Sequence, residues 1–289
     1  MKWHIVGADG YVGSNLLRRL PAGTRCIRYV QKTDTAELAP EEKAFELTAL
    51  TPEIFADIDE GDFVVFLAAI SSPDFCEKQY DFARSINVTG TTQFIETCIG
   101  RGANVLFFSS DVVNGGTLPC SVDETYVGTP IGKYGEMKRE IEQRFYGNPH
   151  FKVFRLSYVY SRQDKFSRYL DDCAGKGVCA EVFDALYRSV IYLEDIFEAI
   201  FRLSETFGEW ENTIFNLSGP ELLSRKDLAV LYVQNVAPSL RFVPIIPPED
   251  FFRARPNIIA TKSLYLEKLL KRPPTHIGQA MKNEYHKGE

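Results

Sequence analysis

Three glycines near the start of the chain limit its fold more than any other feature. Gly7, Gly10 and Gly13 directly follow the apolar stretch 3–6, and residues 11–20 place apolar side chains at the spacing of one helix face. A glycine turn between a strand and a helix lets backbone amides approach a pyrophosphate, which then lies at the positive end of the helix. The sequence therefore predicts that a dinucleotide binds at this turn, although a purely structural turn would show the same residues.

Strands and helices alternate through the first half of the chain. The continuous apolar run 63–69 is typical of a strand buried on both faces of a parallel sheet. Alternation of this kind indicates βαβ units, so we expect an α/β fold with a doubly wound, parallel Rossmann sheet. The predicted strands are 3–6, 25–30, 63–69, 105–108 and 152–156, and the predicted helices are 11–20, 87–99 and 134–145.

The pattern becomes less regular after residue 157. A strand at 189–193 runs into a helix that begins near Glu194, whereas the C-terminal stretch mixes short helices with proline-rich turns. We therefore predict a dinucleotide-binding domain over 1–157, with a return segment at about 186–215. Residues 158–185 and 216–289 are expected to form a smaller, mixed α/β substrate domain.

Composition and charge exclude several classes of protein. The 289 residues carry a net charge of −6 and no run of Lys and Arg longer than two, which argues against nucleic acid as a partner but leaves a small anionic ligand open. No stretch approaches the roughly 18 apolar residues of a membrane helix, and the first strand leaves no room for a signal peptide. We therefore expect a cytoplasmic protein without a membrane partner.

The spacing of cysteines and histidines indicates neither disulfides nor a metal site. The six cysteines contain no Cys-x-x-Cys pair, so free thiols are expected, with Cys173 and Cys179 as the pair whose spacing would close a short loop. The four histidines lie far apart, without the spacing of metal ligands. No metal is therefore predicted.

Tyr134, Lys138 and Ser110 are the candidate catalytic residues. Tyr134 and Lys138 are four residues apart on a predicted helix, so their side chains share one face. A neighbouring ammonium favours the phenolate, which makes proton exchange near neutral pH practical. Ser110 ends a predicted strand at the carboxyl edge of the sheet, where its hydroxyl is placed to polarise a carbonyl oxygen. The alternatives are an exposed helix pair and a serine that caps a turn.

The end of the second strand bears on the choice of cofactor. Sites that prefer NAD usually place a carboxylate there to bind the ribose hydroxyls. This chain has no carboxylate before Asp34, whereas Arg28 and Lys32 are placed to pair with a 2′-phosphate. The sequence therefore favours NADP(H) over NAD(H), unless both cations simply face solvent.

With these features together, the chain resembles the extended short-chain dehydrogenase/reductases. Segments 109–113 and 130–138 are similar to those that carry the family's catalytic hydroxyl and its Tyr and Lys, and segment 67–77 is similar to its fourth strand. The resemblance implies that Glu46 and Leu47 contact adenine and that Asn87 is the structural asparagine of the family. The expected cofactor residues are Gly7, Gly10, Tyr11, Val12, Gly13, Arg28, Lys32, Glu46, Leu47, Leu67, Ala68, Ala69, Asn87, Tyr134 and Lys138.

Within that family, the chain most resembles the dTDP-4-dehydrorhamnose reductases. Segments 69–77, 154–161 and 217–228 carry this likeness. It implies an NADPH-dependent reductase of a nucleotide-linked 4-keto-6-deoxy sugar. The resemblance also implies the substrate residues Asp111, Arg188 and Arg255. The two arginines match general family segments that hold the nucleotide diphosphate, a group that an arginine fork suits. Simple solvation of both arginines is the alternative.

Two residues depart from the family pattern. Asn114 stands where the family commonly has an aromatic residue, so a different substrate pocket is expected. Val112 stands where the related epimerase-reductase that makes GDP-fucose has an acid/base cysteine, which argues against coupled epimerisation of that type.

Two other functions and a dimer also follow from the resemblance. A sugar-nucleotide 4-epimerase would use the same three catalytic residues with bound NAD. A non-catalytic regulatory subunit is the second alternative, because a regulatory partner of methionine adenosyltransferase resembles this branch. The resemblance also implies a homodimer formed through the helices near 88–99 and 134–146, although their apolar faces would equally suit packing within one chain.

Overall fold

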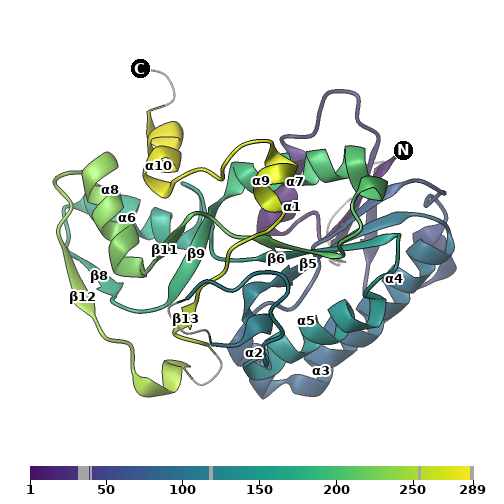
Figure 1. Cartoon of the computed structure of the whole chain (residues 1–289), viewed down its shortest axis with the longest axis horizontal. Helices are drawn as coiled ribbons and strands as arrows, with labels where there is room; N and C mark the ends of the chain where they lie inside the picture. Colours follow the sequence, from purple (N-terminus) through teal and green to yellow (C-terminus); the bar gives the residue numbers. More distant parts are fainter. Residues whose placement is uncertain (32–38, 40, 117–119, 253–254, 287–289) are drawn as a thin grey trace. The chain divides into compact units, whose positions relative to one another are not determined.

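A seven-stranded parallel sheet forms the centre of the computed structural model, which describes residues 1–31, 39, 41–116, 120–252 and 255–286 (Figure 1). Its strand order is β10-β6-β5-β4-β1-β2-β3, so the chain winds outward from β1 in both directions. This arrangement confirms the predicted doubly wound Rossmann sheet. The strands are β1 (Trp3–Val6), β2 (Cys26–Gln31), β3 (Glu42–Phe45), β4 (Phe63–Phe66), β5 (Asn104–Ser110), β6 (Phe151–Leu156) and β10 (Ile214–Leu217).

Contacts between residues divide the chain into two compact units. The first comprises residues 1–109, 132–154 and 204–214, and the second comprises 110–131, 155–203 and 215–289. This grouping places 110–131, 155–157, 186–203 and 215 with the second unit, whereas they were predicted to belong to the dinucleotide-binding domain. The assignment of a cofactor domain and a substrate domain stays a prediction.

The first unit combines parallel strands of the sheet with five α-helices among its described residues. Strands β1, β2 and β4 pair in parallel, with Trp3 beside Cys26 on one side and Phe63 on the other. Side chains on both faces of β4 are buried, as the continuous apolar run predicted. The helices are α1 (Tyr11–Leu17), α2 (Pro73–Lys78), α3 (Tyr80–Arg84), α4 (Thr91–Gly100) and α5 (Gly132–Phe145), with a π-helical turn over Ser85–Gly90.

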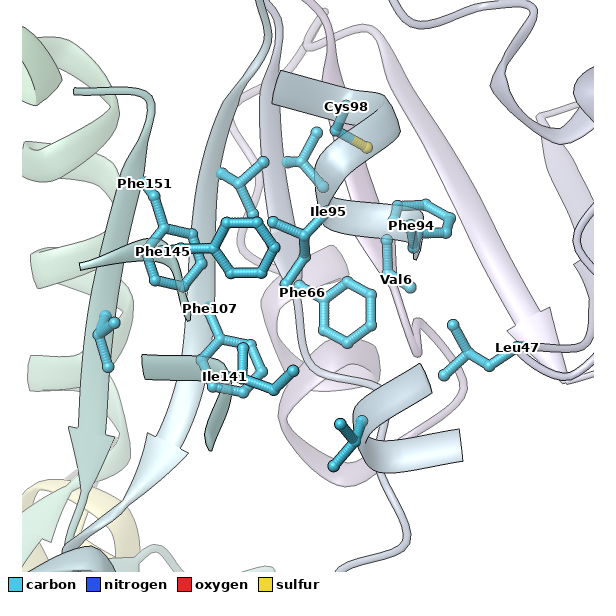
Figure 2. Close-up of a cluster of buried hydrophobic side chains, with 14 of the residues drawn as sticks. Val6, Leu47, Phe66, Phe94, Ile95, Cys98, Phe107, Ile141, Phe145 and Phe151 are labelled. Atoms are coloured by element: carbon cyan, nitrogen blue, oxygen red, sulfur yellow. The ribbon is translucent and has the colours of Figure 1, made fainter. Parts of the chain in front are cut away.

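The core of the first unit is rich in aromatic side chains. Figure 2 shows Phe107, Phe145 and Phe151 close together, with ring centres 5.1 Å apart for Phe145 and Phe151. Phe66 and Phe94 form a second contact at 5.5 Å. The helices α4 and α5 contribute Phe94, Ile95, Cys98, Met137, Ile141 and Phe145 to this cluster. The apolar faces of both helices therefore pack within the chain, and the homodimer stays a prediction.

Several predicted boundaries differ from the structure. Strand β4 ends at Phe66, because residues 67–70 leave the sheet to line a pocket. The helix expected from Asn87 begins earlier, at Tyr80, and Asn87 lies inside the π-helical turn. Strand β3 was not predicted, because its sequence Glu-Lys-Ala-Phe lacks an apolar run.

The second unit is a mixed α/β structure. Strands β11 (Glu221–Leu223), β9 (Tyr187–Tyr192) and β13 (Ile258–Ile259) form one small sheet, which β7 (Val159–Tyr160) joins through β9. Strand β12 (Phe242–Ile245) pairs with β8 (Ala180–Phe183). The helices are α6 (Lys165–Lys176), α7 (Leu193–Thr206), α8 (Arg225–Asn235), α9 (Leu266–Leu270) and α10 (Ile277–Tyr285).

Two further sequence expectations concern cysteines and membranes. All six cysteines are free, including Cys173 and Cys179. Across the described parts of the chain, every helix is too short or too polar to cross a membrane.

Candidate functional site

The glycine turn between β1 and α1 is tightly closed. Gly7 adopts a φ of +84°, and its amide, like that of Ala8, donates to the carbonyl of Tyr29. A Cβ atom on Gly13 would lie 2.4 Å from the Gly7 carbonyl oxygen, and one on Gly7 would lie 2.9 Å from the Ala68 amide nitrogen. Glycine is therefore required at both positions, and the turn brings backbone groups close to the start of α1.

We expect Gly13→Ala to destabilise the first unit and to weaken dinucleotide binding. The new methyl group would force the Gly7 carbonyl to shift, at a cost of roughly 1–3 kcal/mol. Urea unfolding and dinucleotide titration measure the two effects. Gly100→Ala is the matched control, because Gly100 ends α4 with open space around its Cα. Equal stability of the two variants would contradict the steric argument.

A pocket of about 490 Å³ opens beside the glycine turn in the first unit, a size typical of small-molecule sites. Seven of its lining residues were predicted as cofactor residues: Gly7, Gly10, Glu46, Leu47, Leu67, Ala68 and Ala69. Seven others were not predicted: Asp9, Gln31, Phe45, Thr48, Ile70, Phe82 and Ile86. The glycine cradle and the open pocket fit a dinucleotide. The spacing of Phe82 and Ile86 by four residues is the sequence signal that could have indicated the helical side of the pocket.

Other predicted cofactor residues lie outside the lining of this pocket. Tyr11, Val12 and Gly13 belong to α1. Arg28 extends from β2 and pairs with Glu41 at 3.2 Å and Glu42 at 3.3 Å. Lys32, predicted to bind a 2′-phosphate, lies outside the described residues.

Asn87 holds the pocket residue Ile70 in place by hydrogen bonds to its backbone. Its Oδ1 accepts a hydrogen bond from the Ile70 amide at 2.8 Å, and its Nδ2 donates to the Ile70 carbonyl at 2.9 Å. This two-point contact fixes the segment that follows β4, including the pocket residue Ile70. Asn87 is therefore buried as a structural residue.

Tyr134 and Lys138 lie on one face of α5 in the first unit. Lys138 is buried, and its Nζ donates to the carbonyl of Phe108 at 2.8 Å. The same Nζ lies 5.9 Å from the centre of the Tyr134 ring. Burial lowers the pKa of Lys138 to about 7, although the nearby carboxylate of Glu142 favours the charged form. Helix α5 thus holds an amine whose pKa is about 7 close to the phenol of Tyr134.

Ser110 is the last residue of β5 and belongs to the second unit, with Asp111 and Arg188. The buried carboxylate of Asp111 accepts hydrogen bonds from Ser157 Oγ at 3.0 Å and from Ser110 Oγ at 3.3 Å. Arg188 Nε lies 3.8 Å from the same carboxylate. Burial raises the pKa of Asp111, and the Arg188 cation and the two hydroxyls oppose that rise. These predicted residues form one polar cluster, whereas the convergence of Ser110 with Tyr134 on a substrate stays a prediction.

The two predicted phosphate-binding arginines differ in their contacts. Arg188 Nη1 donates to the carbonyls of Tyr187 and Asn257, and its Nη2 donates to the carbonyl of Pro256 at 2.7 Å. Arg188 therefore fastens the segment 256–257. The guanidinium of Arg255 lies 4.8 Å from the ring centre of Phe251. Their contact with a diphosphate stays a prediction.

Asn114 is buried in the second unit. Its Oδ1 accepts a hydrogen bond from Arg155 Nη1 at 3.4 Å, and its Nδ2 has no hydrogen-bond partner within the described chain. The amide of Asn114 thus occupies the position at which the family was expected to have an aromatic side chain in most members. A different substrate pocket remains an expectation.

A parallel sheet with a glycine turn after its first strand and a Tyr-x-x-x-Lys helix defines the class of Rossmann-type short-chain dehydrogenase/reductases. Comparison with known proteins gives the family. The chain belongs to the RmlD substrate binding domain family, whose model matches residues 1–256.

Two curated relatives match part of the chain. Over 105 residues it is 32% identical to methionine adenosyltransferase 2 subunit beta of Xenopus tropicalis, covering 36% of this chain and 31% of that protein. Over 105 residues it is 35% identical to a dTDP-4-dehydrorhamnose reductase of Sinorhizobium fredii, covering 35% of this chain and 34% of that protein. The chain thus spans about a third of the length of these relatives.

Solved structures share the fold along almost the whole chain. The dTDP-4-dehydrorhamnose reductase of Bacillus anthracis, in complex with NADP, has a TM-score of 0.81 at 18% identity and covers 100% of this chain and 99% of that one. MoeE5 in complex with UDP-glucuronic acid and NAD has a TM-score of 0.79 at 18% identity, covering 98% and 97%. Both likenesses establish the fold.

Proposed function

We propose that the protein is a nicotinamide-dinucleotide-dependent reductase of a nucleotide-linked 4-keto-6-deoxy sugar. The observation that carries this proposal is the buried Lys138 ammonium, held by the Phe108 carbonyl near the ring of Tyr134. The π-helical turn 85–90, which supplies the pocket residue Ile86, packs against α5, the helix of both side chains. A family that contains dTDP-4-dehydrorhamnose reductases supports the choice of substrate class.

Each residue has a defined role in this proposal. When bound, the reduced dinucleotide supplies hydride to C4 and is oxidised, while the carbonyl oxygen takes a proton and becomes a hydroxyl. Tyr134 donates that proton, because its phenol is the group placed next to a cation that stabilises the phenolate. Lys138 supplies the cation, and the Ser110 hydroxyl would turn from Asp111 to donate its hydrogen bond to the same oxygen.

The proposal also assigns residues that bind the substrate and the cofactor. Asp111 would bind the sugar, and Arg188 and Arg255 would bind the diphosphate. Gly7, Gly10 and Gly13 would seat the pyrophosphate of the dinucleotide against α1. NADP(H) is the cofactor that Arg28 and Lys32 favour in the sequence.

A turnover assay with nucleotide-linked 4-keto-6-deoxy sugars tests the proposed function. We expect one molecule of reduced dinucleotide to be oxidised for each sugar reduced, with the product hydroxyl at C4. Interconversion of C4 epimers without net oxidation would instead establish the epimerase.

The similarity to methionine adenosyltransferase 2 subunit beta favours one other outcome. A regulatory subunit would bind the dinucleotide, turn over no sugar in the same panel, and co-purify with a partner enzyme in fixed ratio. Turnover at rates typical of enzymes, about 1–10³ per second, would exclude that alternative.

A further inference from the structure

The described residues that line the pocket in the first unit carry charge of the sign opposite to what a 2′-phosphate needs. Its described lining holds two carboxylates, Asp9 and Glu46, and no lysine or arginine. Asp9 is exposed to solvent, so its carboxylate is available to a ligand in the pocket. A phosphate group with a charge near −2 would therefore meet a negative field there.

Asp9 also reaches the position where an acidic residue determines the cofactor. Its Oδ2 accepts a hydrogen bond from the amide of Gln31 at 3.4 Å, and Gln31 is the last residue of β2. Rossmann sites that prefer NAD place a carboxylate at the end of β2, where it accepts hydrogen bonds from the ribose hydroxyls. In this chain the carboxylate comes from the glycine turn and reaches the same place.

Arg28, one of the two cations that favoured NADP(H), is already paired. Arg28 contacts both Glu41 and Glu42 on the neighbouring segment, at 3.2 Å and 3.3 Å. Arg28 and Gln31 are three residues apart on β2, so their side chains leave opposite faces of the strand. Because two carboxylates compensate its single charge, Arg28 offers little net attraction to a phosphate.

We infer that Asp9 selects NAD(H) over NADP(H) by binding the ribose hydroxyls and by repelling a 2′-phosphate. This inference rests on the proposed function only in taking the ligand to be a nicotinamide dinucleotide. It reverses the cofactor preference expected from Arg28 and Lys32. Coulomb repulsion between one carboxylate and a phosphate a few ångströms away in water corresponds to about a ten- to thirtyfold difference in affinity.

Direct titration of the 289-residue protein with NADH and NADPH, without sugar, tests the inference. We expect the wild-type protein to bind NADH at least about tenfold more tightly, with a preference that shrinks as salt screens the carboxylate. Asp9→Asn should tighten NADPH binding by about tenfold and weaken NADH binding, so that the preference is lost or reversed. Asp59→Asn is the matched control, because that exposed aspartate lies outside the pocket lining and should leave both affinities unchanged.

A second variant separates Asp9 from Arg28. Arg28→Gln should leave NADPH affinity within about twofold, because the charge that it removes is already paired. A wild-type preference for NADPH that Arg28→Gln abolishes and Asp9→Asn leaves intact would overturn the inference while leaving the proposed function in place. Failure of the wild-type protein to bind either dinucleotide would overturn both. Urea midpoints of the variants confirm that each titration reports on folded protein.

Discussion

Tyr134→Phe is expected to lower kcat about a thousandfold on the sugar substrate while leaving dinucleotide affinity within about twofold. The substitution removes one hydroxyl, and with it the proton that the developing alkoxide requires. Proton transfer by a positioned side chain contributes roughly 10²- to 10⁴-fold in enzymes. The ring of Tyr134 packs against the core of the first unit, and phenylalanine preserves that packing. Steady-state kinetics and dinucleotide titration measure the two parts of this prediction, and a urea midpoint checks that the variant is folded.

Tyr146→Phe provides the matched control for that experiment. Tyr146 follows α5 in the same unit, and 69% of its surface is exposed. The loss of its hydroxyl should change neither kcat nor stability. If Tyr134→Phe kept the wild-type rate, a different proton donor would be required and the assignment of the helix pair would be wrong.

The first unit was predictable because its signals are local. The apolar run of β4 requires burial on both faces, and the closest approaches at Gly7 and Gly13 allow glycine alone. The pairing of Tyr134 with Lys138 followed from helix spacing. The apolar run, the helix spacing and the contact between Gly13 and Gly7 need only neighbouring residues in the sequence. The approach of Gly7 to Ala68 joins distant segments, and only the glycine motif indicated it.

The pocket charge was not predictable in the same way. NAD-preferring sites are recognised in a sequence by a carboxylate at the end of β2, whereas Asp9 reaches that position from the glycine turn, 22 residues earlier than Gln31. The pairing of Arg28 depends on β3, a short strand without an apolar pattern. Contacts between segments that are separated in the sequence determine both features, and no local sequence pattern indicates them.

Lys138→Met is expected to abolish turnover and to raise the free energy of unfolding. Lys138 is buried, and burial lowers its pKa to about 7, from about 10.4 in an unfolded chain. Holding the charge at neutral pH therefore costs roughly 4 kcal/mol. Methionine removes that cost. It also leaves the Phe108 carbonyl without its hydrogen bond, which lowers the stability by about 1–3 kcal/mol. The net gain of about 1–3 kcal/mol corresponds to a melting temperature higher by several degrees.

The pH dependence of stability separates this explanation from a simple gain in packing. The unfolded lysine holds its proton up to about pH 10, whereas the folded one releases it near pH 7, so between those values the unfolded state binds more protons. Wild-type stability should therefore rise with pH across this window, and the advantage of Lys138→Met should be greatest at or below about pH 7. Urea midpoints at about pH 7 and about pH 10 measure this difference. Lys133→Met, which removes an exposed lysine one turn away, should show no such advantage. If Lys138→Met were more stable than wild type by the same amount at both pH values, the charge of Lys138 would not be the cause. The fold would then lose no stability by keeping an ammonium beside Tyr134.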